Sequence, residues 1–81
     1  MIEEIKQLIE KEINTTELRV DGDGSHYQVI VVSDQFDGLR SVKKQQMVYA
    51  AVNEHIASGE IHALTIKAYT PAEWEKAKLF V

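Results

Sequence analysis

The sequence contains no cysteine and only one proline, and no run approaches the roughly 18 apolar residues that span a membrane. Without thiols the chain can form neither a disulfide framework nor, by itself, a thiolate metal site, and it suits a reducing compartment. Residues 1–12 alternate isoleucine with charged residues, which is unlike a secretory signal. These absences predict a cytoplasmic protein that does not enter the membrane.

Positive charge is also scarce. Nine lysines and arginines stand against 13 aspartates and glutamates, which gives a net charge of −4. Because nucleic-acid binding depends on cationic side chains that neutralise phosphates, this balance disfavours non-specific binding to DNA or RNA. One local basic patch is available, at Arg40, Lys43 and Lys44. Its simpler interpretation is the solvated start of a helix.

The chain does contain enough apolar material for a small folded core. Of its 81 residues, 44% are hydrophobic and 27% are charged, a balance typical of globular proteins. A chain of this length forms one domain, which we expect to comprise residues 1–81. Because so short a chain buries only about 60% of its unfolded surface, the core must be thin.

Hydrophobic periodicity predicts two long helices. Apolar residues recur every three or four positions over residues 2–13, which indicates a helix with one buried face. A second helix is expected over residues 42–57, capped by Ser41 and ended by Gly59 in a left-handed conformation. Its predicted inner stripe consists of Val42, Val48, Ala51, Val52 and Ile56.

Alternating apolar residues predict three strands, at residues 16–21, 26–33 and 61–69. Residues 22–24 (Gly-Asp-Gly) suit a tight reversal, so the first two strands form a hairpin. The second strand is apolar on both faces and should therefore lie in the centre of the sheet. The third strand follows a helix, and a strand reached in this way usually runs parallel to the one before the helix.

A capping-box sequence predicts a short third helix. Thr70 can cap it, Pro71 suits its first turn, and Glu73 completes the box, with Trp74 packing back onto the domain. The element order is then α-β-β-α-β-α, with helices over a three-stranded mixed sheet. This is the α+β class.

No residue pattern indicates catalysis. The chain has neither a cysteine nucleophile nor the Gly-x-Ser-x-Gly or HExxH motif. Residues 21–24 (Asp-Gly-Asp-Gly) look like the start of an EF-hand calcium loop, but Val32 occupies the twelfth position, where a glutamate is needed. We therefore expect no enzyme.

Three histidines are the remaining candidates for a site. His55 borders the buried stripe of the second helix and is expected to be structural. His26 opens the central strand, and His62 opens the third strand at the rim of the sheet. Histidine is the commonest metal-binding side chain, yet most histidines bind no metal, so the residues alone favour structural roles.

Six short motifs follow one another in an order and spacing that match a known family. They are Gly-Ser-His-Tyr-Gln-Val at residues 24–29, Val-Ser at 32–33, Phe-Asp-Gly at 36–38, Met-Val-Tyr at 47–49, Ile-His-Ala-Leu at 61–64 and Tyr-Thr-Pro-Ala-Glu-Trp at 69–74. In these motifs the chain resembles the BolA-like proteins, from about residue 2 to residue 76. Residues 42–46 (Val-Lys-Lys-Gln-Gln) are similar to the acid-inducible IbaG branch of that family.

The resemblance implies a fold and a role. The family core is likened to a class II KH domain, in agreement with the element order predicted from the residues. Its members pair with monothiol glutaredoxins, and the complex holds a [2Fe-2S] cluster whose thiolates come from the glutaredoxin cysteine and glutathione. The family's cluster-binding histidine corresponds here to His62. We therefore expect a non-enzymatic adaptor in cluster trafficking or acid stress, monomeric alone or a weak homodimer.

Two positions depart from the family pattern. Relatives commonly carry a second His or Cys ligand in the hairpin loop where this chain has Asp23, so His26 becomes the alternative second ligand. Relatives also carry Arg-His-Arg where residues 44–46 are Lys-Gln-Gln. A role assigned to Arg-His-Arg is therefore not transferred to this chain.

Two other functions stay open. Some family members are described as transcriptional regulators, and a KH-like surface here would bind nucleic acid through Arg40, Lys43 and Lys44. A KH domain, however, clamps the backbone with a Gly-x-x-Gly loop, and residues 38–41 (Gly-Leu-Arg-Ser) lack the second glycine. The third possibility is an interaction module that binds no metal, with residues 79–81 as a small apolar contact.

Overall fold

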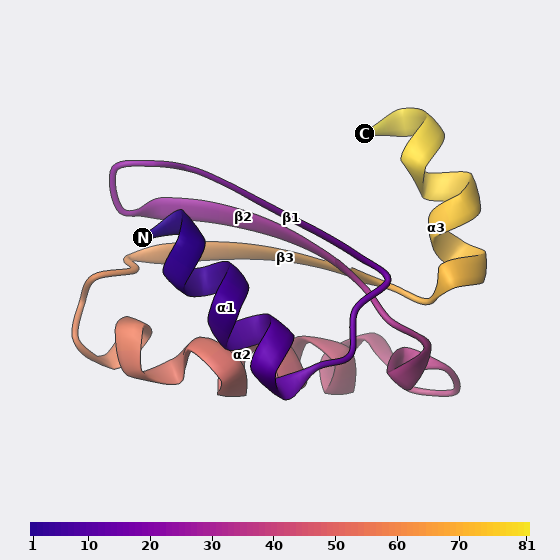
Figure 1. Cartoon of the computed structure of the whole chain (residues 1–81), viewed down its shortest axis with the longest axis horizontal. Coiled ribbons are helices and arrows are strands. Elements are labelled where there is room, and N and C mark those ends of the chain that lie inside the picture. The colour runs from indigo at the N-terminus through magenta and orange to yellow at the C-terminus, as the bar shows by residue number, and fades with distance from the viewer.

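The structure, a computed structural model, describes residues 1–81 and contains three helices and one sheet (Figure 1). The elements are α1 (Ile2–Glu12), β1 (Glu17–Asp23), β2 (His26–Val32), α2 (Ser41–Ala57), β3 (Ala63–Tyr69) and α3 (Pro71–Ala77), with short 3-10 turns at Asp34–Phe36 and Lys78–Phe80. This order confirms the predicted α-β-β-α-β-α fold of the α+β class. None of the helices is both long and apolar enough to span a membrane.

β2 lies in the middle of the sheet, between an antiparallel β1 and a parallel β3. β1 and β2 pair without interruption from Glu17↔Val32 to Asp23↔His26. β2 and β3 pair over all seven residues of each strand. The central place of β2 and the parallel return of β3 after α2 are both as predicted.

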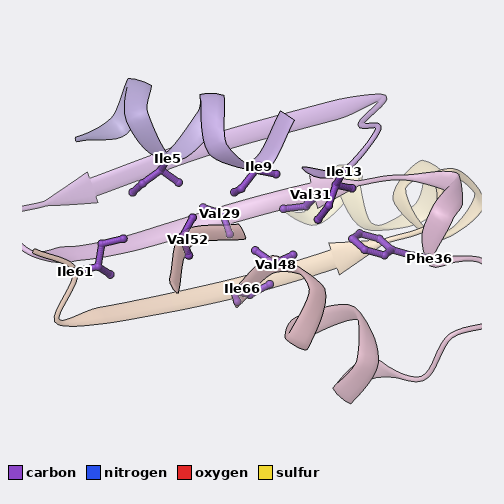
Figure 2. Packing of buried hydrophobic residues seen from close by; sticks show 10 residues of the cluster. All are labelled: Ile5, Ile9, Ile13, Val29, Val31, Phe36, Val48, Val52, Ile61 and Ile66. Atoms are coloured by element: carbon purple, nitrogen blue, oxygen red, sulfur yellow. The ribbon is translucent and has the colours of Figure 1, made fainter. Parts of the chain in front are cut away.

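The main core lies on the face of the sheet that α1 and α2 cover. Figure 2 shows side chains from these two helices and from the central strand gathered between the layers. The buried cluster consists of Ile5, Ile9, Ile13, Val29, Val31, Phe36, Val48, Val52, Ile61 and Ile66. Because side chains alternate along a strand, Val29 and Val31 face this core, whereas Ile30 and Val32 face the other way.

The opposite face of the sheet is covered at one end only. There Trp74 of α3 packs against Ile30 and Val32, and its ring centroid lies 5.6 Å from that of Tyr69. The predicted capping box at the start of α3 is present, and it fixes the direction in which the helix leaves the sheet. Figure 1 shows α3 at the end of the sheet remote from the β1–β2 hairpin loop, so the start of β2 has no helix over this face.

The end of β1 and the start of β3 each differ from the prediction by two residues, and the other strand ends lie within one residue of it. β1 continues to Asp23, and the reversal is confined to Gly24 and Ser25, with φ of 67° at Gly24. The glycine at position 22 therefore belongs to the strand rather than to the turn. β3 begins at Ala63 instead of residue 61, because Ile61 turns into the core before the strand starts.

α2 differs from the prediction in its first turn. The helix begins at Ser41 itself, so Ser41 is not its cap. Val42 is 69% exposed, whereas Lys44 is only 8% exposed. Lys44 precedes the buried Val48 by four residues and so shares its face of the helix, while Val42 lies roughly 200° around from Lys44. At the other end the prediction is confirmed, since Gly59 has a φ of 86°.

Candidate functional site

His62 lies where the chain enters β3. It follows the buried Ile61 and is itself exposed. Its backbone N–H donates to the carbonyl oxygen of Ser25 at 2.9 Å, and the N–H of Ala63 donates to the same oxygen at 3.3 Å. Because Ser25 forms the turn between β1 and β2, the loop that carries His62 is fastened to the tip of the hairpin. Figure 1 shows both loops at the same end of the sheet.

His26 is the first residue of β2 and pairs with Ala63, the residue after His62. On its other side it pairs with Asp23 across the hairpin. The structure thus places both histidines predicted as ligands, and the aspartate that replaces the expected hairpin-loop ligand, at the same end of the sheet. All three residues are exposed.

A shallow depression of about 370 Å³ lies beside His26 at the hairpin end of the sheet. Its lining is Asp21, Gly22, Asp23, His26, Tyr27, Gln28 and Thr65. The ring of Tyr27 lies over its cross-strand partner Gly22, where an added Cβ would stand 2.5 Å from the Cε1 atom. Gly22 thus permits an aromatic ring to cover the hairpin directly next to His26.

The side chains at this end of the sheet suit a metal centre shared with another molecule. No three His, Asp or Glu side chains gather closely enough anywhere in the chain to hold a metal ion. His62 and His26 nevertheless offer exposed imidazoles, and imidazole replaces thiolate as a ligand in some [2Fe-2S] centres. The residues present could therefore supply one or two metal ligands, but not a complete set.

The three cations of the predicted basic patch are not equivalent. The Nζ atom of Lys44 lies 2.9 Å from Oε1 of Glu73, and its side chain is buried between α2 and α3. Lys44 is therefore not part of a solvated helix start, and its charge is already neutralised. Arg40 and Lys43 remain exposed.

The hydrogen-bonded group around His55 was not predicted. Nδ1 of His55 lies 2.8 Å from Oε1 of Glu60, and the hydroxyl of Ser58 donates to the same oxygen at 3.0 Å. These contacts, that of His55 foremost, hold the pKa of Glu60 below its usual range. The sequence signal was only a histidine and a glutamate five residues apart around the end of a helix. The segment they stabilise leads directly to His62.

Fold and site together define a class of protein. It is a small α+β domain with a mixed three-stranded sheet and an exposed histidine held against a hairpin tip. The sequence model of the BolA-like protein family matches residues 4–73, so the chain belongs to this family.

Individual relatives agree with that assignment. The chain is 52% identical over 73 residues to the acid stress protein IbaG of Escherichia coli K12, covering 90% of this chain and 87% of the relative. It superposes on BolA1 from Arabidopsis thaliana with a TM-score of 0.81 at 30% identity, covering 89% of this chain and 93% of that one. The BolA domain of SufE1 from the same plant gives a TM-score of 0.80 at 33% identity, with the same coverage. The resemblance to the family and to its acid-inducible branch is therefore confirmed.

Proposed function

We propose that this protein is a non-enzymatic adaptor that pairs with a monothiol glutaredoxin and supplies His62 as a ligand to a [2Fe-2S] cluster between them. The observation that carries the proposal is the placement of His62, which is exposed while its backbone is fixed to the hairpin tip. An exposed imidazole on a fixed backbone can approach a partner's metal centre without rearrangement of the domain. Membership of the BolA-like family supports the same partner.

The available donor atoms support a shared cluster. A [2Fe-2S] cluster needs four ligands in addition to its own sulfides, usually thiolates, and this chain has no cysteine. The resemblance to the BolA-like family implies that the thiolates come from the glutaredoxin cysteine and glutathione, and in our proposal this chain contributes imidazole. An imidazole ligand raises the reduction potential relative to thiolate, and it must be neutral in order to bind iron. When bound, the cluster supplies redox-active iron, whereas this chain's residues bind and orient it.

His26 is the proposed second ligand from this chain. It lies beside the His62 segment through its pairing with Ala63, and it borders the depression at the hairpin end. Asp23 occupies the position of the second ligand in relatives, but a carboxylate is a harder ligand than the thiolate or imidazole found there. We therefore assign Asp23 to the rim of the site.

The cellular role that we propose is cluster trafficking in the cytoplasm or the response to acid. The support for the second is the name of the Escherichia coli relative, an acid stress protein with 52% identity to this chain. An imidazole ligand connects the two roles, because protonation at low pH competes with iron for the same nitrogen.

The test is anaerobic co-expression with a monothiol glutaredoxin, followed by measurement of iron content and of the visible absorption and circular dichroism spectra. The wild-type chain should yield a coloured heterodimer. His62→Ala should change the spectrum and shorten the lifetime of the cluster, and His26→Ala should do so if it is the second ligand. Gln28→Ala, an exposed change in the same depression, serves as the matched control and should leave the spectrum unchanged.

Two results would contradict the proposal. One is a heterodimer whose spectrum and iron content are unaffected by both histidine substitutions. The other is the absence of any complex between the purified proteins when iron, sulfide and glutathione are supplied. A spectrum that responds to His62→Ala but not to His26→Ala would keep the function and remove His26 from the ligand set.

Nucleic-acid binding through the KH-like surface has less support. Arg40 and Lys43 are exposed, but Lys44 forms an ion pair with Glu73. The patch therefore offers two positive charges to a nucleic acid instead of three. No observation favours this alternative over the adaptor role.

A further inference from the structure

We propose that His55 is a positioning residue for His62, because it holds in place the segment, residues 58–61, that delivers His62 to the end of the sheet. The importance of this placement rests on the proposed function, in which His62 is a cluster ligand. The placement itself is a property of the isolated chain.

The backbone of His55 is the first attachment point of the segment. Its carbonyl oxygen accepts a hydrogen bond from the N–H of Ile61 at 3.1 Å, and it lies 3.1 Å from the hydroxyl oxygen of Ser58, whose single proton is shared between this carbonyl and Glu60. One carbonyl at the end of α2 therefore closes the loop that follows the helix. Because Ile61 is 2% exposed within the core, the residue before His62 is held by packing as well.

The imidazole of His55 is the second attachment point. Its Nδ1 atom lies 2.8 Å from Oε1 of Glu60. An ionised carboxylate can only accept, so Nδ1 must carry the proton and donate it. The same carboxylate oxygen accepts from Ser58, whose hydroxyl oxygen in turn accepts from the N–H of Glu60 at 3.4 Å. The ring thus fixes the exposed side of a loop whose inner side is fixed by Ile61.

The far end of this segment is also attached. The N–H of His62 donates to the carbonyl of Ser25 at the hairpin tip. The segment that carries His62 is therefore attached at both ends. His55 holds it to the end of α2, and the hydrogen bond to Ser25 holds it to the turn between β1 and β2. If either attachment were lost, the backbone that positions the His62 imidazole would be held at one end only.

A purely structural role for His55 is the competing explanation. The ring also faces α1, where Nε2 lies 3.9 Å from Oε2 of Glu4, and a groove beside it is lined by Gln7, Leu8 and Lys11. If His55 serves only to join α1 to α2, its loss would lower overall stability without a specific effect at His62. The two roles use different nitrogens of the ring, and this allows them to be separated.

The experiment compares four variants of the full chain. His55→Asn keeps an N–H donor at the position of Nδ1. His55→Gln places the donor at the position of Nε2 instead, so the hydrogen bond to Glu60 is lost. Glu60→Ala removes the acceptor at an exposed residue where folding is not at risk. Glu4→Ala removes the contact with α1 and is the matched control.

The first measurement is backbone amide hydrogen exchange in the isolated chain. Exchange at Ile61 and His62 should accelerate about two- to fivefold in His55→Gln and Glu60→Ala, the effect of losing an exposed hydrogen-bonded pair, and remain near wild type in His55→Asn and Glu4→Ala. Amides of the core strand, such as that of Val31, should not change in any variant. Unchanged exchange at Ile61 and His62 in Glu60→Ala would overturn the proposal.

The second measurement is the circular dichroism spectrum of the cluster in the complex with glutaredoxin. His55→Gln and Glu60→Ala should move the spectrum toward that of His62→Ala, and His55→Asn should restore it. If His62→Ala alters the spectrum while these variants do not, the positioning role is wrong and the proposed function stands. If His62→Ala itself has no effect, the assignment of His62 as a cluster ligand is wrong, and the exchange data still decide whether His55 places His62.

Discussion

The Nζ atom of Lys44 lies 2.9 Å from the Oε1 atom of Glu73, and this ion pair joins the first turn of α2 to the capping box of α3. The same oxygen of Glu73 accepts the backbone N–H of Thr70 at 2.8 Å. One carboxylate oxygen therefore both caps α3 and neutralises a buried lysine. The pair lies across the edge of the sheet from one helical layer to the other.

Lys44→Ala should destabilise the domain by about 1–2 kcal/mol, between the values typical of exposed and of buried ion pairs. Glu73 is half exposed, so its charge can be solvated after the change, but the buried stem of the lysine also loses its packing. Lys43→Ala, an exposed neighbour, is the control and should change stability by less than about 0.5 kcal/mol. The measurement is urea unfolding, and equal effects of the two substitutions would contradict the structural role of Lys44.

Glu73→Gln should lower stability in a manner that depends on pH. The hydrogen bond from Thr70 and, next, that from Lys44 hold the pKa of Glu73 below its ordinary value of about 4.5. A carboxylate with a depressed folded-state pKa contributes stability above the unfolded pKa, and this contribution is lost as the pH falls through the folded pKa.

The difference between wild type and Glu73→Gln should therefore be about 0.5–1 kcal/mol near pH 7, given the exposure of the carboxylate, and should shrink below about pH 4.5. Thermal unfolding between pH 3 and pH 7 measures it. Glu75→Gln, in an exposed pair with Lys78 on the same helix, should change stability little at pH 7. A difference for Glu73→Gln that grows on acidification would contradict the assigned cause.

The element order was predictable because each element has a strong local signature. The capping box of α3 needs only residues within four positions of one another, and the two apolar faces of β2 identify a central strand without knowledge of its partners. The turn of the hairpin was less predictable. Gly22 looks like a turn residue in the sequence, whereas in the structure it is a strand residue that admits the ring of Tyr27.

The side-chain pairs that tie elements together were not predictable in the same way. Lys44 lies on the buried row of α2, four residues before Val48, and its burial depends on a partner 29 residues further along the chain. Short-range periodicity contains no information on such a partner. For the candidate site, the sequence pattern predicted that His62 lies at the rim of a strand. The hydrogen bond to Ser25 could not be predicted in this way, because it depends on the parallel pairing of β2 and β3.

Nucleic-acid binding, if present, should be weak and insensitive to Lys44. Because this patch offers only Arg40 and Lys43 to phosphates, binding through it should give a logarithm of the binding constant that falls with the logarithm of salt concentration with a slope no steeper than about −2. Fluorescence anisotropy with single-stranded and duplex DNA between 50 and 200 mM salt, a range in which such contacts are strongly screened, measures the slope. A steep slope that Lys43→Glu abolishes would favour the regulator function over the adaptor.

Gly22→Ala should disturb the hairpin next to His26 through a steric clash. The new Cβ would overlap the ring of Tyr27, which cannot move freely because it packs against the main core. Overpacking of this kind costs about 1–3 kcal/mol. The backbone of Gly22 is not in the left-handed region, so the clash is the only source of the effect.

A double-mutant cycle isolates that clash. In a Tyr27→Ala background the obstacle is gone, and Gly22→Ala should then cost less than about 0.5 kcal/mol. Gly24→Ala is the control, because Gly24 has a φ of 67° and open space around it. Its cost of about 1–2 kcal/mol comes from backbone strain and should be the same in both backgrounds. If the cost of Gly22→Ala were likewise independent of Tyr27, the ring would not be the reason for the glycine.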